Sequence, residues 1–163
     1  QQSRICKIIN EKLYGTISGK KITILGFSFK ANTNDTRESP AIKVCKELLL
    51  EGAKLAIYDE RVSVNQIKIA LSEYKYSLTL DQDESSWTFS KNILDSTKDS
   101  DAIIILTESE TFKSLNWEVI AKEMKSPSWL FDTRGVIQTS EVIKHNINLW
   151  SLGYGDIKSN KFN

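Results

Sequence analysis

Apolar positions along the chain fall into short continuous runs that are separated by segments with a spacing of three to four residues. Continuous runs predict strands that are covered on both faces, whereas the longer spacing predicts amphipathic helices. The runs predict strands at residues 21–27, 54–59, 101–107, 128–135 and 147–153, the last as an edge strand. The spacing predicts helices at residues 1–16, 40–51, 64–74, 91–100, 116–124 and 140–145.

The first helix lacks a capping residue in front of it. Its apolar stripe consists of Ile5, Ile8, Ile9, Leu13 and Tyr14. A helix without a start signal is expected to begin at or before the first residue, which indicates a longer parent protein.

Strands and helices alternate along the whole chain, a pattern typical of an α/β fold with a doubly wound, Rossmann-like parallel sheet and helices on both faces. The polar stretch around Trp87 and Phe89 is interpreted as satellite core. The stretch from Gly155 onward is expected to be frayed.

Composition narrows the function classes. The 163 residues include 22 basic and 21 acidic side chains, so the overall charge gives no reason to expect binding to nucleic acid or to a membrane surface. No apolar stretch is long enough to span a membrane and no signal peptide is visible, so we expect a cytoplasmic protein. Cys6 and Cys45 are expected to be buried thiols, and with a single histidine, His145, no metal site is predicted.

The chemistry gathers in the turn "GFSFKANTNDTRESPA", residues 26–41, between the first strand and the helix that Ser39 caps. A dinucleotide site needs GxGxxG here, and only Gly26 is present. Asp59 lies too far along the chain for a ribose-binding acid, so it is interpreted as a turn former. Lys30, Arg37 and Phe29 could instead hold an anion and a planar ring.

Two readings of these charges stay open. The turn could be a solvated loop in which Arg37 pairs with Asp35 or Glu38. Arg134 in "FDTRG" ends another strand at the same edge of the sheet and could join Lys30 and Arg37 in one crevice, or could be held by Asp132 as a structural pair.

Together, "ILGFSFKANTNDTRESPAI" and "FDTRG" resemble the GxxFKxxTxDxRES stretch and the later D-x-R turn of the UDP-glucose/GDP-mannose dehydrogenase family, in its C-terminal UDP-binding domain. The resemblance covers nearly the whole chain. It implies that residues 1–18 are the end of a long central dimerisation helix, that 19–157 bind the nucleotide sugar, and that 158–163 form a frayed tail. Thr133 replaces the glycine that is more usual in the D-x-R turn.

The resemblance also implies roles for four residues. Phe29, Lys30 and Arg134 match substrate contacts to a UDP-sugar, and Arg37 matches a contact to NAD that a preceding domain holds. Family enzymes oxidise the sugar's C6 alcohol to a carboxylate with two NAD and a catalytic cysteine, so UDP-glucose would give UDP-glucuronate. The chain has neither the NAD motif nor that cysteine's motif, so no catalytic residue is predicted and the chain alone is expected to be inactive.

Three alternatives are weighed against this reading. The first is a non-catalytic nucleotide-binding or assembly module that dimerises through apolar residues exposed on the first helix. The second is a family member that acts on UDP-N-acetylmannosamine or GDP-mannose. The third, a phosphoacceptor receiver domain, is disfavoured because Phe27 and Ser28 stand where it needs an acidic pair.

Overall fold

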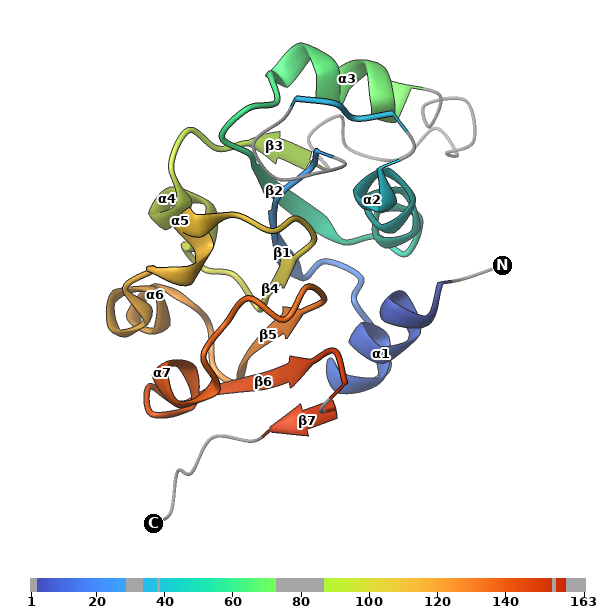
Figure 1. The fold of residues 1–163 in the computed structure, drawn as a ribbon. Coiled ribbons are helices and arrows are strands. Elements are labelled where there is room, and N and C mark those ends of the chain that lie inside the picture. Colours follow the sequence, from blue (N-terminus) through green and yellow to red (C-terminus); the bar gives the residue numbers. More distant parts are fainter. Residues whose placement is uncertain (1–2, 29–33, 38, 73–86, 154, 158–163) are drawn as a thin grey trace.

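A computed structural model describes residues 3–28, 34–37, 39–72, 87–153 and 155–157. These residues form one seven-stranded sheet with helices on both faces (Figure 1), which confirms the predicted fold class. The strands are β1 (Lys21–Leu25), β2 (Lys54–Tyr58), β3 (Trp87–Phe89), β4 (Ala102–Ile105), β5 (Ser128–Asp132), β6 (Ile147–Ser151) and β7 (Gly155–Ile157). The helices are α1 (Arg4–Lys12), α2 (Pro40–Leu50), α3 (Val64–Ser72), α4 (Ile93–Thr97), α5 (Glu110–Lys113), α6 (Trp117–Glu123) and α7 (Thr139–Ile143).

The order of strands in the sheet is β3-β2-β1-β4-β5-β6-β7. The first six are parallel, and β7 pairs with β6 in the antiparallel direction. The parallel strands therefore have the doubly wound order 3-2-1-4-5-6, in which the chain changes direction between β1 and β4.

Two apolar layers enclose the sheet. Helices α1, α2 and α3 pack on one face with Ile22, Ile24 and Phe131, while α4 to α7 and their connections pack on the other with Ile103 and Leu130. All four residues of β4 are buried, as its isoleucine-rich sequence predicted. The sheet is thus packed on both faces, and it holds the loops that leave the ends of its strands.

Two expectations about the ends of the sheet are wrong, and a third is incomplete. Trp87 and Phe89 are half-buried and pack against the core, as expected of satellite core, but they do so as part of the edge strand β3, which pairs with β2. Residues 147–151 are not an edge strand, because Gly155 to Ile157 fold back beside them as β7 rather than fraying. The predicted tail, residues 158–163, lies outside the described residues.

Two expectations about α1 are also wrong. The helix does have an N-cap, Ser3, whose Oγ accepts the amide of Cys6 and donates to the Glu47 carboxylate at 2.6 Å. Its apolar stripe is largely covered, because Ile9 and Leu13 are buried in this chain's own core, and Tyr14 alone among the five stripe residues is exposed. Serine directly before a helix is a common N-cap, so the signal was present in the sequence, and Glu47, 44 residues away, adds a second hydrogen bond to the same hydroxyl.

Candidate functional site

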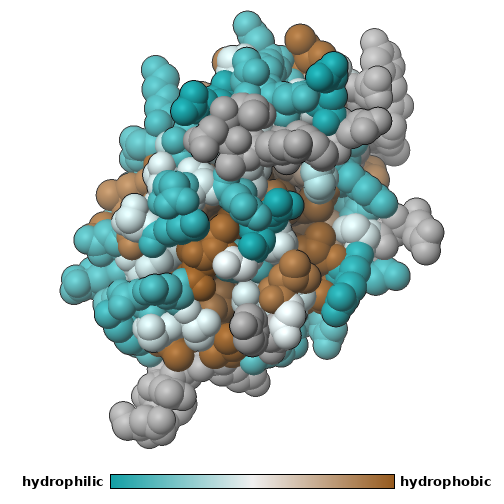
Figure 2. Space-filling model, in the orientation of Figure 1, coloured by the Kyte–Doolittle hydropathy of each residue, from teal (hydrophilic) through white to brown (hydrophobic). Residues whose placement is uncertain are grey.

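Parallel α/β sheets bind ligands at the carboxyl ends of their strands, near the point where the strand order reverses. In this chain that point lies between β1 and β4. The described residues that follow β1, β2, β4 and β5 form the rim there, namely residues 26–28, 34–37, 39, 59–63, 106–109 and 133–138. In the face that Figure 2 shows, apolar surface gathers over these central strands and hydrophilic side chains surround it.

Gly26 fixes the contact between the loops after β1 and β4. Its φ is +94°, and a Cβ placed on it would lie 2.4 Å from the Cβ of Thr107. The Thr107 hydroxyl donates to the carbonyl of Ser28 at 2.9 Å. Only glycine allows this approach, so the two loops are held against each other directly above the sheet.

Asp59 organises the loops after β1 and β2. Its buried carboxylate accepts the amides of Phe27 at 2.7 Å and Ser28 at 3.0 Å through one oxygen. The other oxygen accepts the amides of Arg61 at 2.8 Å and Val62 at 3.0 Å. Asp59 is therefore the turn former that the sequence predicted, and both of its oxygens are engaged by backbone donors.

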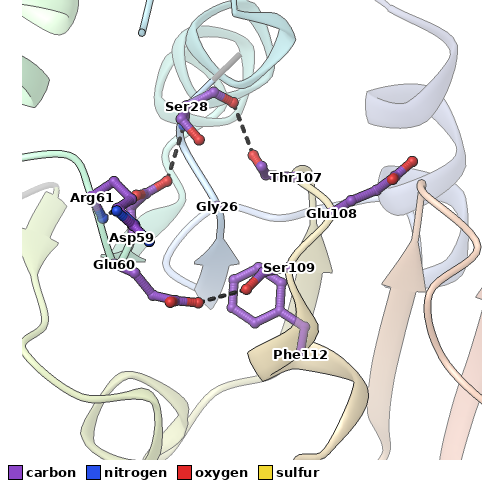
Figure 3. Close-up of a pocket in the computed structure, with 9 residues that line it drawn as sticks. All are labelled: Gly26, Ser28, Asp59, Glu60, Arg61, Thr107, Glu108, Ser109 and Phe112. Carbon is purple, nitrogen blue, oxygen red and sulfur yellow. Dashed lines mark hydrogen bonds between the residues drawn. The ribbon is translucent and has the colours of Figure 1, made fainter. Parts of the chain in front are cut away.

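A small cavity lies among these loops (Figure 3). Its volume is about 20 Å³, room for about one water molecule, so a nucleotide could bind over it but not inside it. The Ser109 hydroxyl donates to Glu60 at 2.5 Å across the cavity, whereas the Glu108 carboxylate points away from that pair. The lining residues are Gly26, Ser28, Asp59, Glu60, Arg61, Thr107, Glu108, Ser109 and Phe112.

Arg134 lies at the neighbouring part of the rim. Asp132, which is fully buried, accepts the amides of Arg134 at 3.1 Å and Gly135 at 2.9 Å, and a third amide two residues further on. The guanidinium pairs instead with Glu108, at 3.3 Å between Nη2 and Oε1. Of the two readings left open, Asp132 thus holds the backbone of the turn and leaves the arginine side chain to the rim.

The unusual residue in this turn, Thr133, has a structural role. Its hydroxyl donates to the carbonyl of Ile105, the last residue of β4, at 2.5 Å. A glycine could not form this bond, so the threonine ties the loop after β5 to the neighbouring strand.

The remaining predicted site residues are Arg37, Phe29 and Lys30. Arg37 is 89% exposed and forms a two-point pair with Asp35, with distances of 3.0 and 3.1 Å, as the solvated-loop reading proposed. Asp35 raises the pKa of Arg37 through these contacts. Phe29 and Lys30 lie outside the described residues, so convergence of Lys30, Arg37 and Arg134 stays a prediction.

Two rim residues were missed from the sequence. Arg61 lines the cavity just after β2, and Glu108 lines it just after β4. The available signal was position, since charged residues two or three places beyond a parallel strand face the ligand edge.

Comparison with known proteins now adds to this geometry. Residues 23–139 match the model of the UDP binding domain of the UDP-glucose/GDP-mannose dehydrogenase family. The chain belongs to this family. UDP-glucose 6-dehydrogenase 4 of Arabidopsis thaliana is 35% identical over 94% of this chain and 34% of that protein, and UDP-glucose 6-dehydrogenase 1 of the same plant is 36% identical with the same coverage. The chain thus spans about a third of these relatives.

Solved structures agree. A UDP-D-ManNAc dehydrogenase from Pyrococcus horikoshii superposes with a TM-score of 0.68 at 26% identity, over 93% of this chain and 30% of that one. An NDP-N-acetyl-D-galactosaminuronic acid dehydrogenase from Methanosarcina mazei Go1 gives 0.71 at 21% identity, over 93% and 28%, a likeness that concerns the fold alone.

The described residues of the switch point do not fit the pyrophosphate of NAD. The space that a dinucleotide's phosphates would need beside Gly26 is filled by Thr107. Asp59 cannot accept ribose hydroxyls, because four amides already occupy its oxygens.

Neither cysteine is suited to nucleophilic chemistry, as predicted. Both are buried and free. Burial raises the pKa of Cys6 to about 12, with Glu47 contributing, and burial likewise raises the pKa of Cys45. Among the described residues, no group of three or more acidic, cysteine and histidine side chains could hold a metal ion. No described helix has both the length and the apolar character that a membrane crossing requires.

Proposed function

We propose that this chain binds the nucleotide end of a UDP-sugar within an NAD-dependent dehydrogenase that oxidises UDP-glucose to UDP-glucuronate. The observation that carries the proposal is Arg134, which two loop anchors hold at the ligand edge of the sheet in a domain whose family model is named for UDP binding. We choose UDP-glucose over other nucleotide sugars because the relatives that match are named UDP-glucose 6-dehydrogenases.

The proposed binding mode follows from the shape of the rim. The cavity is too small for a nucleotide, so the ligand would lie across the loops, with its diphosphate at Arg134 and its base over the apolar centre of this face. Phe29 and Lys30 would complete the contacts from the loop after β1. Arg37, which is exposed on that loop, would reach the NAD held by a preceding domain.

In this scheme the chain supplies binding and not chemistry. Binding energy gained at the nucleotide would align the reacting carbon of the sugar with a cysteine and a cofactor carried elsewhere in a longer protein. The chain alone would bind ligand without turning it over. That longer protein would form a homodimer through an extended α1. Tyr14, which is 76% exposed here, would be one of the contacts between the two copies.

Isothermal titration of the chain with UDP, UDP-glucose and GDP at low salt tests the proposal. We expect saturable binding of both uridine ligands and weaker binding of GDP. Arg134→Ala should weaken UDP binding by about 1.5–3 kcal/mol, the range for a hydrogen bond to a charged group. Arg4→Ala, which removes the same charge from the exposed start of α1, should change nothing.

Equal effects of the two arginine variants would refute the role of Arg134, and equal binding of GDP would refute the preference for uridine. In the longer enzyme, Arg37→Ala should raise the apparent constant for NAD more than that for the sugar. An unchanged NAD constant would remove Arg37 from the scheme.

A further inference from the structure

We propose that Glu108 is an internal counter-ion that occupies the guanidinium of Arg134 until the anionic group of a ligand displaces it. This inference deepens the proposed function and rests on it in one respect, that Arg134 meets a phosphate group of the ligand. Glu108 would then set a threshold, because it lowers the affinity of the rim by the same factor for every anion that uses Arg134.

The backbones on both sides of the pair are fixed. Glu108 directly follows Thr107, which is locked to the loop after β1 by its hydrogen bond to Ser28 and by its contact with Gly26. Arg134 lies between Thr133, which is bound to β4, and an amide run held by Asp132. The two side chains therefore meet because two rigid loops direct them to the same place.

The hydrogen bonds of the neighbouring carboxylates distinguish Glu108 from Asp59 and Glu60. Asp59 has both oxygens engaged by amides, and Glu60 accepts the hydroxyl of Ser109. Glu108 is directed away from these groups and toward the cation of the next loop (Figure 3). Its position thus places a negative charge where the proposed function needs the charge of a diphosphate.

The pair is suited to displacement. The side chains of Arg134 and Glu108 are 40% and 57% exposed, and ion pairs this exposed contribute little to stability. A phosphate can replace the carboxylate with stronger, two-point hydrogen bonds. The cost of displacement is the same for each anion, so weak binders such as free phosphate fall below useful affinity while a ligand with further contacts does not.

An NMR titration of the whole 163-residue chain with inorganic pyrophosphate at low salt tests the inference, read at the backbone amides of Arg134 and Gly135 and at Arg134 Nε–H. Glu108→Gln should bind pyrophosphate about two- to fivefold more tightly than the unaltered chain, the upper part of the range that the energy of an exposed ion pair gives. Adding Arg134→Ala to Glu108→Gln should abolish the gain.

Glu110→Gln is the matched control. Glu110 is exposed, lies two residues away and pairs with Lys113, so its replacement makes the same change in net charge without freeing Arg134. Its affinity should stay within about twofold of the unaltered chain, because screened charges that do not touch the ligand contribute little.

The inference is overturned if Glu108→Gln binds pyrophosphate equally or more weakly, if Glu110→Gln gains as much, or if neither form shifts the Arg134 signals. A loss of affinity in Glu108→Gln would mean that Glu108 positions the arginine for the ligand. Failure of the proposed function is a separate result, since a chain without a preference for uridine can still show the Glu108 effect with pyrophosphate.

Discussion

Replacing Asp59 by alanine should destabilise the chain more than any ordinary polar substitution in the sheet. Asp59 directly follows β2. Its carboxylate accepts four backbone amides from two different loops, at distances of 2.7 to 3.0 Å. Without it, the loops after β1 and β2 lose their common anchor. The effect should therefore reach the ligand edge as well as the stability of the fold.

The magnitude follows from where the four donors lie. Phe27 and Val62 are buried, so their amides would lose the partner that Asp59 provides, whereas the amide of exposed Arg61 can turn to water. An unsatisfied buried donor costs about 1–3 kcal/mol, and partial relaxation of the turn favours the low end. Two such donors give a loss of about 2–4 kcal/mol in the free energy of unfolding.

Urea unfolding followed by the fluorescence of the buried tryptophans would measure this loss. Asp59→Asn keeps one acceptor oxygen and should lose about half as much. Asp101→Ala is the matched control, because that carboxylate accepts the backbone amide of Lys21 at 3.0 Å, and the variant should lose about 1 kcal/mol. If Asp59→Ala lost no more than Asp101→Ala, the anchoring role of Asp59 would be wrong.

Three further predictions concern packing and charge. Gly26→Ala should lower the free energy of unfolding by about 2–4 kcal/mol, because the new Cβ meets Thr107. Gly135→Ala, which has a similar positive φ and open space around it, should lower it by about 1 kcal/mol, and equal melting temperatures of the two variants would contradict the contact. Both cysteines should resist a thiol reagent at pH 8 until urea is added. Because burial raises the pKa of Cys6 from 9.0 to about 12, the stability that its protonated thiol contributes should be fully present below pH 9 and be lost as the pH rises toward 12, and Cys6→Ala should reduce the fall in stability over that range. Lys12→Gln breaks the ion pair that joins α1 to Asp156 of β7 and should cost at most about 1 kcal/mol, a difference that 1 M salt should remove.

The central part of the fold could be predicted because local signals and tertiary packing agree there. Ser39 and Pro40 begin α2, and the apolar run at β4 is buried on both faces. The errors have two causes. The cap of α1 is a local signal, Ser3, that was overlooked, whereas β7 forms by pairing with β6, which is not visible in a short stretch of sequence.

The candidate site shows the same contrast between local signals and distant partners. The role of Asp59 could be predicted, since an acid at the end of a strand commonly holds the following turn. The partner of Arg134 could not, because Glu108 precedes it by 26 residues and the two meet only when β4 and β5 pair. The sequence offered Asp132 as the nearer partner, and the fold uses that residue for the backbone.

Both predicted cations that the structure describes carry a neighbouring carboxylate, Asp35 beside Arg37 and Glu108 beside Arg134. Each of these two arginines is thus neutralised by its neighbour before a ligand binds. A neutralised arginine gives little long-range attraction for anions, so recognition has to come from short contacts. If so, the affinity for UDP should fall less steeply with salt than expected for two unpaired arginines, and Glu108→Gln should steepen that dependence. A slope that Glu108→Gln leaves unchanged would show that the pair does not govern the charge that the ligand meets.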